Sequence, residues 1–171
     1  MVLYILITRI PNLAVRTFLA DMLGVQSQDT VLVDNASEAI NDILRNFEPP
    51  LSADEYIIDL STAYTPFEGF YAWLGERLGV KTITIPIMWP LTGDDSFTVP
   101  VANFLANNAS TINIRCAVFS HISAYPSVLL PVAALTALFH QYNIPVIIDG
   151  AHALVTSDVY TLANPGYSYP H

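Results

Sequence analysis

The sequence alternates between short apolar runs and longer segments in which apolar residues recur at helical spacing. The clearest example is the apolar run at residues 145–149, which ends at Asp149 and follows a helical pattern between Pro131 and Asn143. Pro suits the first helical position because no N–H is needed there. A continuous apolar run is typical of a strand buried on both faces of a parallel sheet. The pattern therefore predicts a helix and then a strand with a carboxylate at its C-terminal end, where open α/β sheets bind ligands.

The same alternation continues along the rest of the chain and predicts a mainly parallel α/β sheet with helices on both faces. We predict one domain over residues 1–171, with an irregular tail at residues 154–171, where Thr, Ser, Asn, Pro and Tyr replace the periodic pattern. The other predicted helices lie at residues 12–23, 35–44, 67–78 and 99–107, the last after a loop at 88–96, and the other strands at residues 29–34, 55–60, 81–87 and from 116 onward.

The composition is unusually apolar. Hydrophobic residues make up 53% of the chain, charged residues only 12%, and the mean hydropathy is +0.44; an average soluble domain is about 25% charged. A buried central sheet accounts for part of this excess. The rest predicts a surface that other protein normally covers, and we expect a homo-oligomer.

The net charge of −9 excludes several partners. Without a basic patch to neutralise phosphates, the chain is not expected to bind nucleic acid or an anionic membrane surface. The opening MVLYILI is too short to span a bilayer and no small-residue cleavage site follows it, so a cytoplasmic location is the default. Cys116 is the one cysteine, which excludes an intrachain disulfide and predicts a buried thiol.

The segments SHISAYPSVLLPV and DGAHA, at residues 120–132 and 149–153, carry a resemblance to a known family. They resemble the class V aminotransferases, which use pyridoxal phosphate (PLP), and most closely the isopenicillin N epimerase-like and cysteine desulfurase-like branches. The resemblance implies the large domain of the fold-type I PLP enzymes. Ser127 departs from the pattern, since the family usually has Gly there.

The resemblance also implies a cofactor site. Asp149 would pair with the protonated pyridine nitrogen of PLP, which the ring needs in order to act as an electron sink. His152 would lie near the 3-hydroxyl group, and Ser123 would contribute from the upstream loop. The alternatives are that Asp149 only begins a turn with Gly150, and that His152 is a core residue.

The phosphate and the ring face have their own candidate residues. The segment Asn35-Ala36-Ser37 resembles the family's phosphate-binding turn, and the unpaired N–H groups at a helix start favour an anion. The resemblance implies that Tyr64 stacks on the pyridine ring, since the family has a Tyr or His near this point. The alternatives are an ordinary N-cap at Asn35 or Ser37 and a Tyr64 that only packs its loop.

No residue is predicted to be catalytic. In the resembling family, the lysine that holds PLP covalently follows the Asp motif, but Lys81 is the one lysine of this sequence and lies at the start of a different strand. We therefore expect a partial chain that lacks the lysine region and the small domain. Two hypotheses remain open. One is part of a PLP enzyme that acts on an amino acid or cysteine-derived substrate, as an epimerase, C–S lyase or desulfurase. The other is a non-catalytic remnant that acts through protein–protein interaction.

Overall fold

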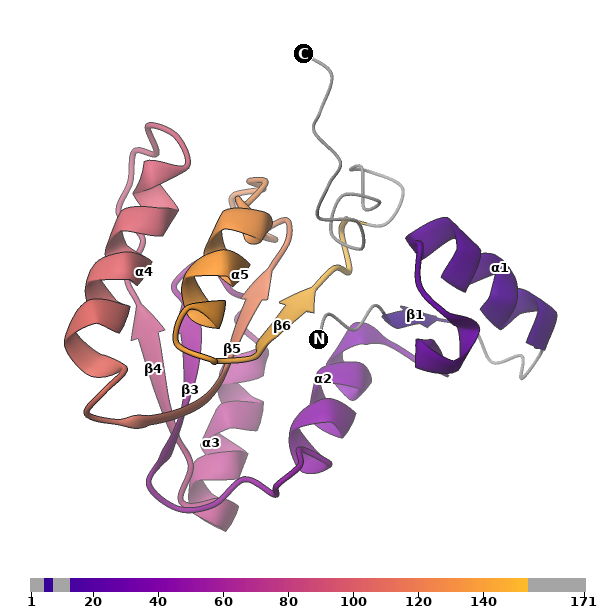
Figure 1. The fold of residues 1–171 in the computed structure, drawn as a ribbon, viewed down its shortest axis with the longest axis horizontal. Helices are drawn as coiled ribbons and strands as arrows, with labels where there is room; N and C mark the ends of the chain where they lie inside the picture. Colours follow the sequence, from indigo (N-terminus) through magenta and orange to yellow (C-terminus); the bar gives the residue numbers. More distant parts are fainter. Residues whose placement is uncertain (1–4, 8–12, 154–171) are drawn as a thin grey trace.

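A computed structural model describes residues 5–7 and 13–153 of the chain (Figure 1). The predicted tail at residues 154–171 lies outside the described residues. The elements in chain order are β1 (Ile5–Ile7), α1 (Leu13–Leu23), a 3₁₀ turn η1 (Ser27–Asp29), β2 (Val31–Val33), α2 (Ala36–Arg45), β3 (Glu55–Leu60), α3 (Phe67–Leu78), β4 (Lys81–Ile85), α4 (Asp95–Asn108), β5 (Asn113–Ser120), α5 (Val132–His140) and β6 (Val146–Asp149).

A four-stranded sheet in the order β4-β3-β5-β6 forms the centre of the fold, and each neighbouring pair is parallel. Parallel strands cannot be joined by a tight turn, so each connection carries a helix: α3 joins β3 to β4, α4 joins β4 to β5, and α5 joins β5 to β6. From β3 the chain first adds β4 on one side and then returns to add β5 and β6 on the other side, so the direction in which strands are added reverses between β3 and β5. The predicted fold class, a mainly parallel α/β sheet, is confirmed.

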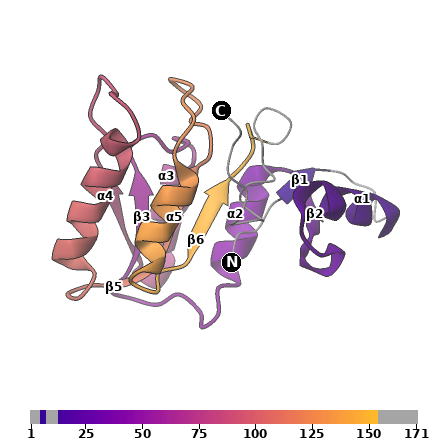
Figure 2. The ribbon, with the colours of Figure 1, turned by 45° about the horizontal axis from the view of Figure 1, so that its top comes forward.

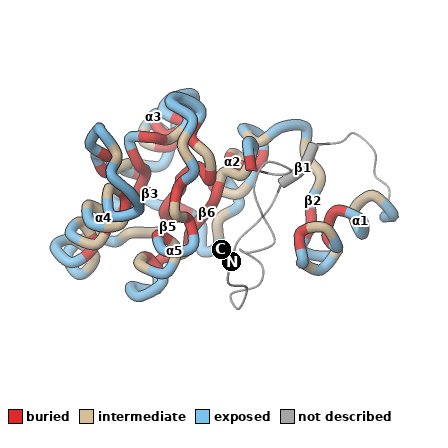
Figure 3. Tube along the Cα trace, turned by 90° about the horizontal axis from the view of Figure 1, so that it is seen from above, coloured by how far each residue is buried: buried red, intermediate tan, exposed pale blue. Residues whose placement is uncertain are grey.

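Helices cover both faces of this sheet. In Figure 1, α4 and α5 lie in front of the strands and α3 lies behind them. Successive residues of β3 divide between the two faces: Ile58 packs in the cluster that includes α4 and α5, and Ile57 packs in the cluster that includes α2 and α3. Figure 3 shows the consequence, with buried residues concentrated along the strands and exposed residues on the outer sides of the helices.

Several boundaries differ from the sequence prediction, among them the start of β5, which is Asn113 rather than residue 116. Helix α4 begins at Asp95 rather than at residue 99, because Phe97 is buried and extends the apolar stripe formed by Val101 and Leu105. The helix tolerates Pro100 near its start. Strand β4 ends at Ile85 rather than at residue 87.

The predicted strand at residues 29–34 does not join the central sheet. It forms β2, which pairs in parallel with β1 in a separate two-stranded sheet. The end of α1 still reaches the main body, since Leu23 and Ala153 are both buried in one small cluster.

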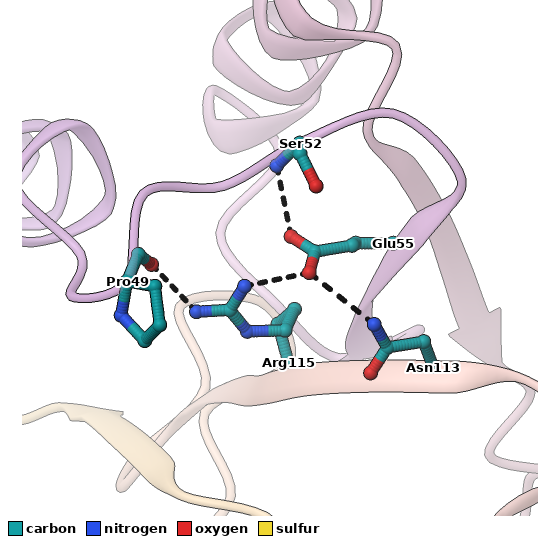
Figure 4. Close-up of polar contacts among 5 residues, drawn as sticks. All are labelled: Pro49, Ser52, Glu55, Asn113 and Arg115. Carbon is teal, nitrogen blue, oxygen red and sulfur yellow. Dashed lines mark hydrogen bonds and ion pairs between the residues drawn. The ribbon is translucent and has the colours of Figure 1, made fainter.

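A polar cluster fixes the amino-terminal end of the sheet (Figure 4). Arg115 of β5 donates from Nη1 to Oε1 of Glu55 on β3 at 2.6 Å, and from Nη2 to the carbonyl oxygen of Pro49 at 2.6 Å. Asn113 also donates to Glu55 Oε1, and the backbone N–H of Ser52 donates to Oε2. Burial by itself raises the pKa of Glu55, but the hydrogen bonds from Arg115 and Ser52 outweigh it, so the pKa is lowered. The buried carboxylate therefore stays ionised and crosslinks two strands and the loop before them.

Among the helices in the described ranges, none has the length and apolar content needed to cross a bilayer.

Candidate functional site

The carboxyl-terminal edge of the sheet gathers the polar residues that follow the strands. Strands β3, β5 and β6 end at Leu60, Ser120 and Asp149. The reversal of strand order between β3 and β5 makes this edge the expected ligand-binding crevice of an open α/β sheet. Figures 1 and 2 show that the N-terminal end of α2 lies at this edge too, beside the end of β6.

Asp149 is the last residue of β6. Its backbone oxygen accepts a hydrogen bond from the N–H of His121 at 2.8 Å, which ties it to the end of β5. Its Oδ1 accepts from the N–H of Ala151 at 3.0 Å, so the residue does begin a turn, as one interpretation of the sequence expected. The second carboxylate oxygen makes no hydrogen bond within the described residues, and it is therefore available to a ligand. His152 lies in the turn that follows and is exposed.

The start of α2 is capped by Asn35, whose Oδ1 accepts from the N–H of Glu38 at 2.8 Å. The expectation of an ordinary N-cap at Asn35 is thus correct. The cap leaves the backbone N–H groups of Ala36 and Ser37 without a hydrogen bond in the described part of the chain, and Ser37 is exposed. These two groups and the positive end of the helix dipole suit an anion.

Ser123 is fully buried, and its hydroxyl serves its own loop. It donates to the carbonyl oxygen of Pro126 at 2.6 Å and accepts from the N–H of Val128 at 3.1 Å. The structure therefore gives Ser123 a role in shaping the loop after β5.

Tyr64 lies in the loop after β3 and is 39% exposed. Its ring meets the edge of Phe67 at 5.5 Å between centroids, with an interplanar angle of 82°. The Tyr64 side chain is thus partly exposed at the same edge of the sheet. Tyr64 also borders a groove between α3 and β4, which Asp149, Ala36 and Ser37 do not line.

Three buried polar residues near this edge were not anticipated from the sequence. His121 follows β5, its Nδ1 has no hydrogen-bond partner, and burial lowers its pKa, so the imidazole is neutral at pH 7. Asp59 and Tyr71 line the groove beside Tyr64. The one sequence signal for Asp59 is a carboxylate inside the otherwise apolar end of β3, Ile57-Ile58-Asp59-Leu60.

Lys81 lies at the opposite edge of the sheet. It is the first residue of β4, and its ammonium group binds Asp54 Oδ1 at 2.6 Å. The one lysine of the sequence therefore cannot reach Asp149. Among the described residues there is also no group of three His, Cys, Asp or Glu side chains that could hold a metal ion.

Sequence comparison relates the chain to L-cysteine desulfhydrases. No family model matches the chain. It is 25% identical over 150 residues to an L-cysteine desulfhydrase of Arabidopsis thaliana, a match that covers 83% of this chain and 33% of the relative. The chain thus spans about a third of the length of the curated relatives it matches.

Solved structures share the fold. The cysteine desulfurase CsdA of Escherichia coli superimposes with a TM-score of 0.70 at 19% identity, over 87% of this chain and 36% of that one. The cystine C–S lyase C-DES, in a form with glycine covalently linked to its PLP cofactor, gives a TM-score of 0.69 at 21% identity, over 81% of this chain and 35% of that one. The resemblance to the cysteine desulfurase-like branch is confirmed: the relatives include L-cysteine desulfhydrases, and the fold matches that of PLP-dependent cysteine desulfurases.

Proposed function

We propose that this chain supplies the cofactor-binding part of a PLP-dependent C–S lyase, of the desulfhydrase or desulfurase type, that acts on cysteine or a cysteine-derived substrate. One observation carries the proposal: Asp149 ends β6 with a free carboxylate oxygen at the edge where α2 begins. The similarity to L-cysteine desulfhydrase and the fold shared with C-DES support both the cofactor and the substrate class.

The residues present fit the chemistry of PLP in three places. The N–H groups of Ala36 and Ser37, together with the helix dipole, suit the phosphate. The free oxygen of Asp149 suits the protonated ring nitrogen, and the partly exposed aromatic side chain of Tyr64 suits the pyridine ring. Ser123 and His152 remain predicted contacts, and Ser123 would need to exchange its bond to Pro126 for one to the cofactor.

Bound PLP supplies an electron sink for bond cleavage beside the substrate nitrogen. The residues of this chain would hold PLP and keep its ring nitrogen protonated. Asp149 would keep a proton on the ring nitrogen, because a carboxylate held against it favours the charged form. Tyr64 would exclude water from one ring face. The neutral His121, tied to the Asp149 backbone, would hold the end of β6 in place.

The test is a titration of the 171-residue chain with PLP, followed by visible absorbance and circular dichroism. We expect reversible binding, with Asp149→Ala weakening it at least tenfold, which is about 1.4 kcal/mol. Asp95→Asn, an exposed acid at the start of α4, should leave it unchanged. Equal affinity of wild type and Asp149→Ala would refute the site.

The same preparation tests catalysis. We expect no turnover of L-cysteine and no attachment of PLP to Lys81 after borohydride reduction, since that lysine pairs with Asp54 at the far edge. Labelling of Lys81, or turnover that Asp149→Ala abolishes, would show that this lysine had been recruited. If PLP does not bind at all, a non-catalytic remnant that acts through a protein partner becomes the better hypothesis.

A further inference from the structure

A groove of about 440 Å³ lies between α3 and the part of the sheet formed by β3 and the edge strand β4. Its volume lies within the range of small-molecule sites. Thr82 and Thr84 line it from β4, Glu68 and Tyr71 from α3, and Asp59 from β3, while Tyr64 stands at its border with the carboxyl-terminal edge. The proposed PLP contacts at Asp149, Ala36 and Ser37 are not part of it.

Asp59 forms the buried floor of this groove. It is 5% exposed. Its neighbours in the strand, Ile58 and Leu60, pack on the other face of the sheet, so its side chain is directed toward α3. Oδ1 accepts a hydrogen bond from the N–H of Leu60 at 2.6 Å, while the second oxygen has no partner within the described residues. Beside it, the buried hydroxyl of Tyr71 also lines the groove and has no hydrogen-bond partner among the described residues. A buried polar group left unpaired is costly, and a polar group of a ligand would offset that cost.

The charged groups around Asp59 favour a positively charged ligand. Glu68 lies close enough to add to the pKa shift of Asp59, which burial, as the main cause, raises to about 7. No Lys, Arg or His is among the described residues that line the groove. The side chains of Tyr71, Thr82 and Thr84 add only hydroxyl groups. The groove thus presents two carboxylates and several hydroxyls with no cation of its own.

We propose that this groove binds a small organic cation through a primary ammonium group that donates to Asp59 and Glu68. The three N–H donors of an ammonium group match two carboxylates and a threonine hydroxyl. The partly exposed Tyr64, which lines the groove at its border, adds an aromatic ring for a cation–π contact. A divalent metal is less suited, since the described residues contain no cluster of three acidic, His or Cys ligands here.

The experiment is a titration of the uniformly ¹⁵N-labelled 171-residue chain with n-butylammonium chloride, followed by amide chemical shifts. PLP is left out, so the result is independent of the proposed function. The neutral isostere n-butanol and calcium chloride are titrated in parallel. We expect saturable shifts at Glu68, Thr82 and Thr84 with the amine, none with the alcohol, and weaker binding of Ca²⁺ than of the amine.

Variants connect the binding to the two carboxylates. Asp59→Asn keeps the shape but removes the charge and should weaken amine binding at least tenfold, while Glu68→Gln should weaken it several-fold. Glu76→Gln is the matched control, because Glu76 is an exposed acid on α3 that does not line the groove. Glu68 is exposed, so its substitution reports on binding even if the Asp59 variant does not fold. Equal shifts with n-butanol, tighter binding of Ca²⁺, or unchanged affinity in both carboxylate variants would overturn the proposal.

Discussion

Asp59 is the residue at which local sequence and tertiary environment conflict most strongly. It occupies a buried strand position that an apolar residue would fill without electrostatic cost, and burial raises its pKa to about 7. The unfolded chain releases this proton near the ordinary value of 3.8. Between these two values the folded protein holds the proton and the unfolded chain does not. The contribution of protonated Asp59 to the free energy of unfolding is therefore fully present below the pKa of the unfolded chain. It is lost as the pH rises through the pKa of the folded protein.

This pH dependence gives the first prediction. Asp59→Asn removes the titration, so at pH 8 the variant should be more stable than wild type by on the order of 3 kcal/mol, with little difference at pH 4. The measurement is urea unfolding at both pH values. Asp42→Asn, at an exposed position of α2, should show no such pH-dependent gain. Glu68 and Tyr71 face Asp59 from α3, so the same comparison in a Glu68→Gln background isolates the titration of Asp59. A parallel pH profile in wild type and Asp59→Asn would contradict the assignment.

At the level of single elements, two of the three glycines of the α3 region, Gly69 and Gly79, differ in whether a larger residue could replace them. Gly79 ends α3 in the left-handed region with φ of 73°, and a Cβ there would lie 2.9 Å from the Cβ of Ala53. Gly69 lies inside α3, where an added Cβ meets nothing within 4 Å. The helix end therefore requires glycine at position 79, while position 69 in the helix interior does not.

These differences predict that alanine substitutions at the two positions change the stability in opposite directions. Gly79→Ala should destabilise the fold by about 1–2 kcal/mol, because it adds backbone strain and a close contact. Gly69→Ala should stabilise it by about 0.5–1 kcal/mol, since glycine is a poor helix former. Thermal unfolding of the two variants checks the pair. A loss of stability from Gly69→Ala would mean that α3 packs more tightly at this position than the structure shows.

The strand ends offer a second comparison between elements. Glu55 and Arg115 join β3 to β5 with side chains that are mostly buried, while Asp54 and Lys81 form a pair at the same end of the sheet with largely exposed side chains. Removing one partner of a buried pair leaves an uncompensated charge, whereas exposed pairs contribute little.

Arg115→Met should therefore destabilise the protein by about 3 kcal/mol near pH 7. The lowered pKa of Glu55 means that this contribution is present above its unfolded value of 4.5 and is lost as the pH falls. Lys81→Met should change the urea midpoint very little. If the two variants lose similar stability, the buried cluster in Figure 4 is not what fixes the amino-terminal edge.

At the scale of the whole molecule, the carboxyl-terminal edge exposes large apolar side chains in the loops after β4 and β5. Met88 is 74% exposed and Leu129 is 56% exposed, and Trp89 and Tyr125 in the same two loops are exposed as well. Apolar surface of this kind marks an interaction site or an aggregation liability. It agrees with the low content of charged residues.

We therefore expect concentration-dependent self-association of the chain. Light scattering across a dilution series should show a mass above that of the 18.8 kDa monomer, and the double substitution Met88→Ser with Leu129→Ser should shift the chain toward the monomer. Val99→Ser, exposed on α4, is the control and should leave association unchanged. A monodisperse wild-type monomer at high concentration would rule this out.

The sequence was enough to predict the α/β class and most of the elements of the central sheet. Apolar runs such as residues 145–149 report burial on both faces, and buried parallel strands need helices between them, so periodicity alone implies the layers. The position of Asp149 at a strand end and of Asn35 at a helix start also follow from local patterns, because strand ends and caps are decided within a few residues. The early start of α4 was missed because burial of Phe97 depends on the sheet it packs against.

Only the tertiary structure could decide which of these residues meet. The hydroxyl of Ser123 forms hydrogen bonds within its own loop, and the strand at residues 31–33 belongs to a separate two-stranded sheet. Asp59 and Tyr71 line a groove that no sequence motif predicts. The physical reason is that hydrogen-bond partners and desolvation arise from chain segments far apart in sequence. Local pattern fixes what each element is, and the packing of elements fixes the environment, and hence the chemistry, of each polar side chain.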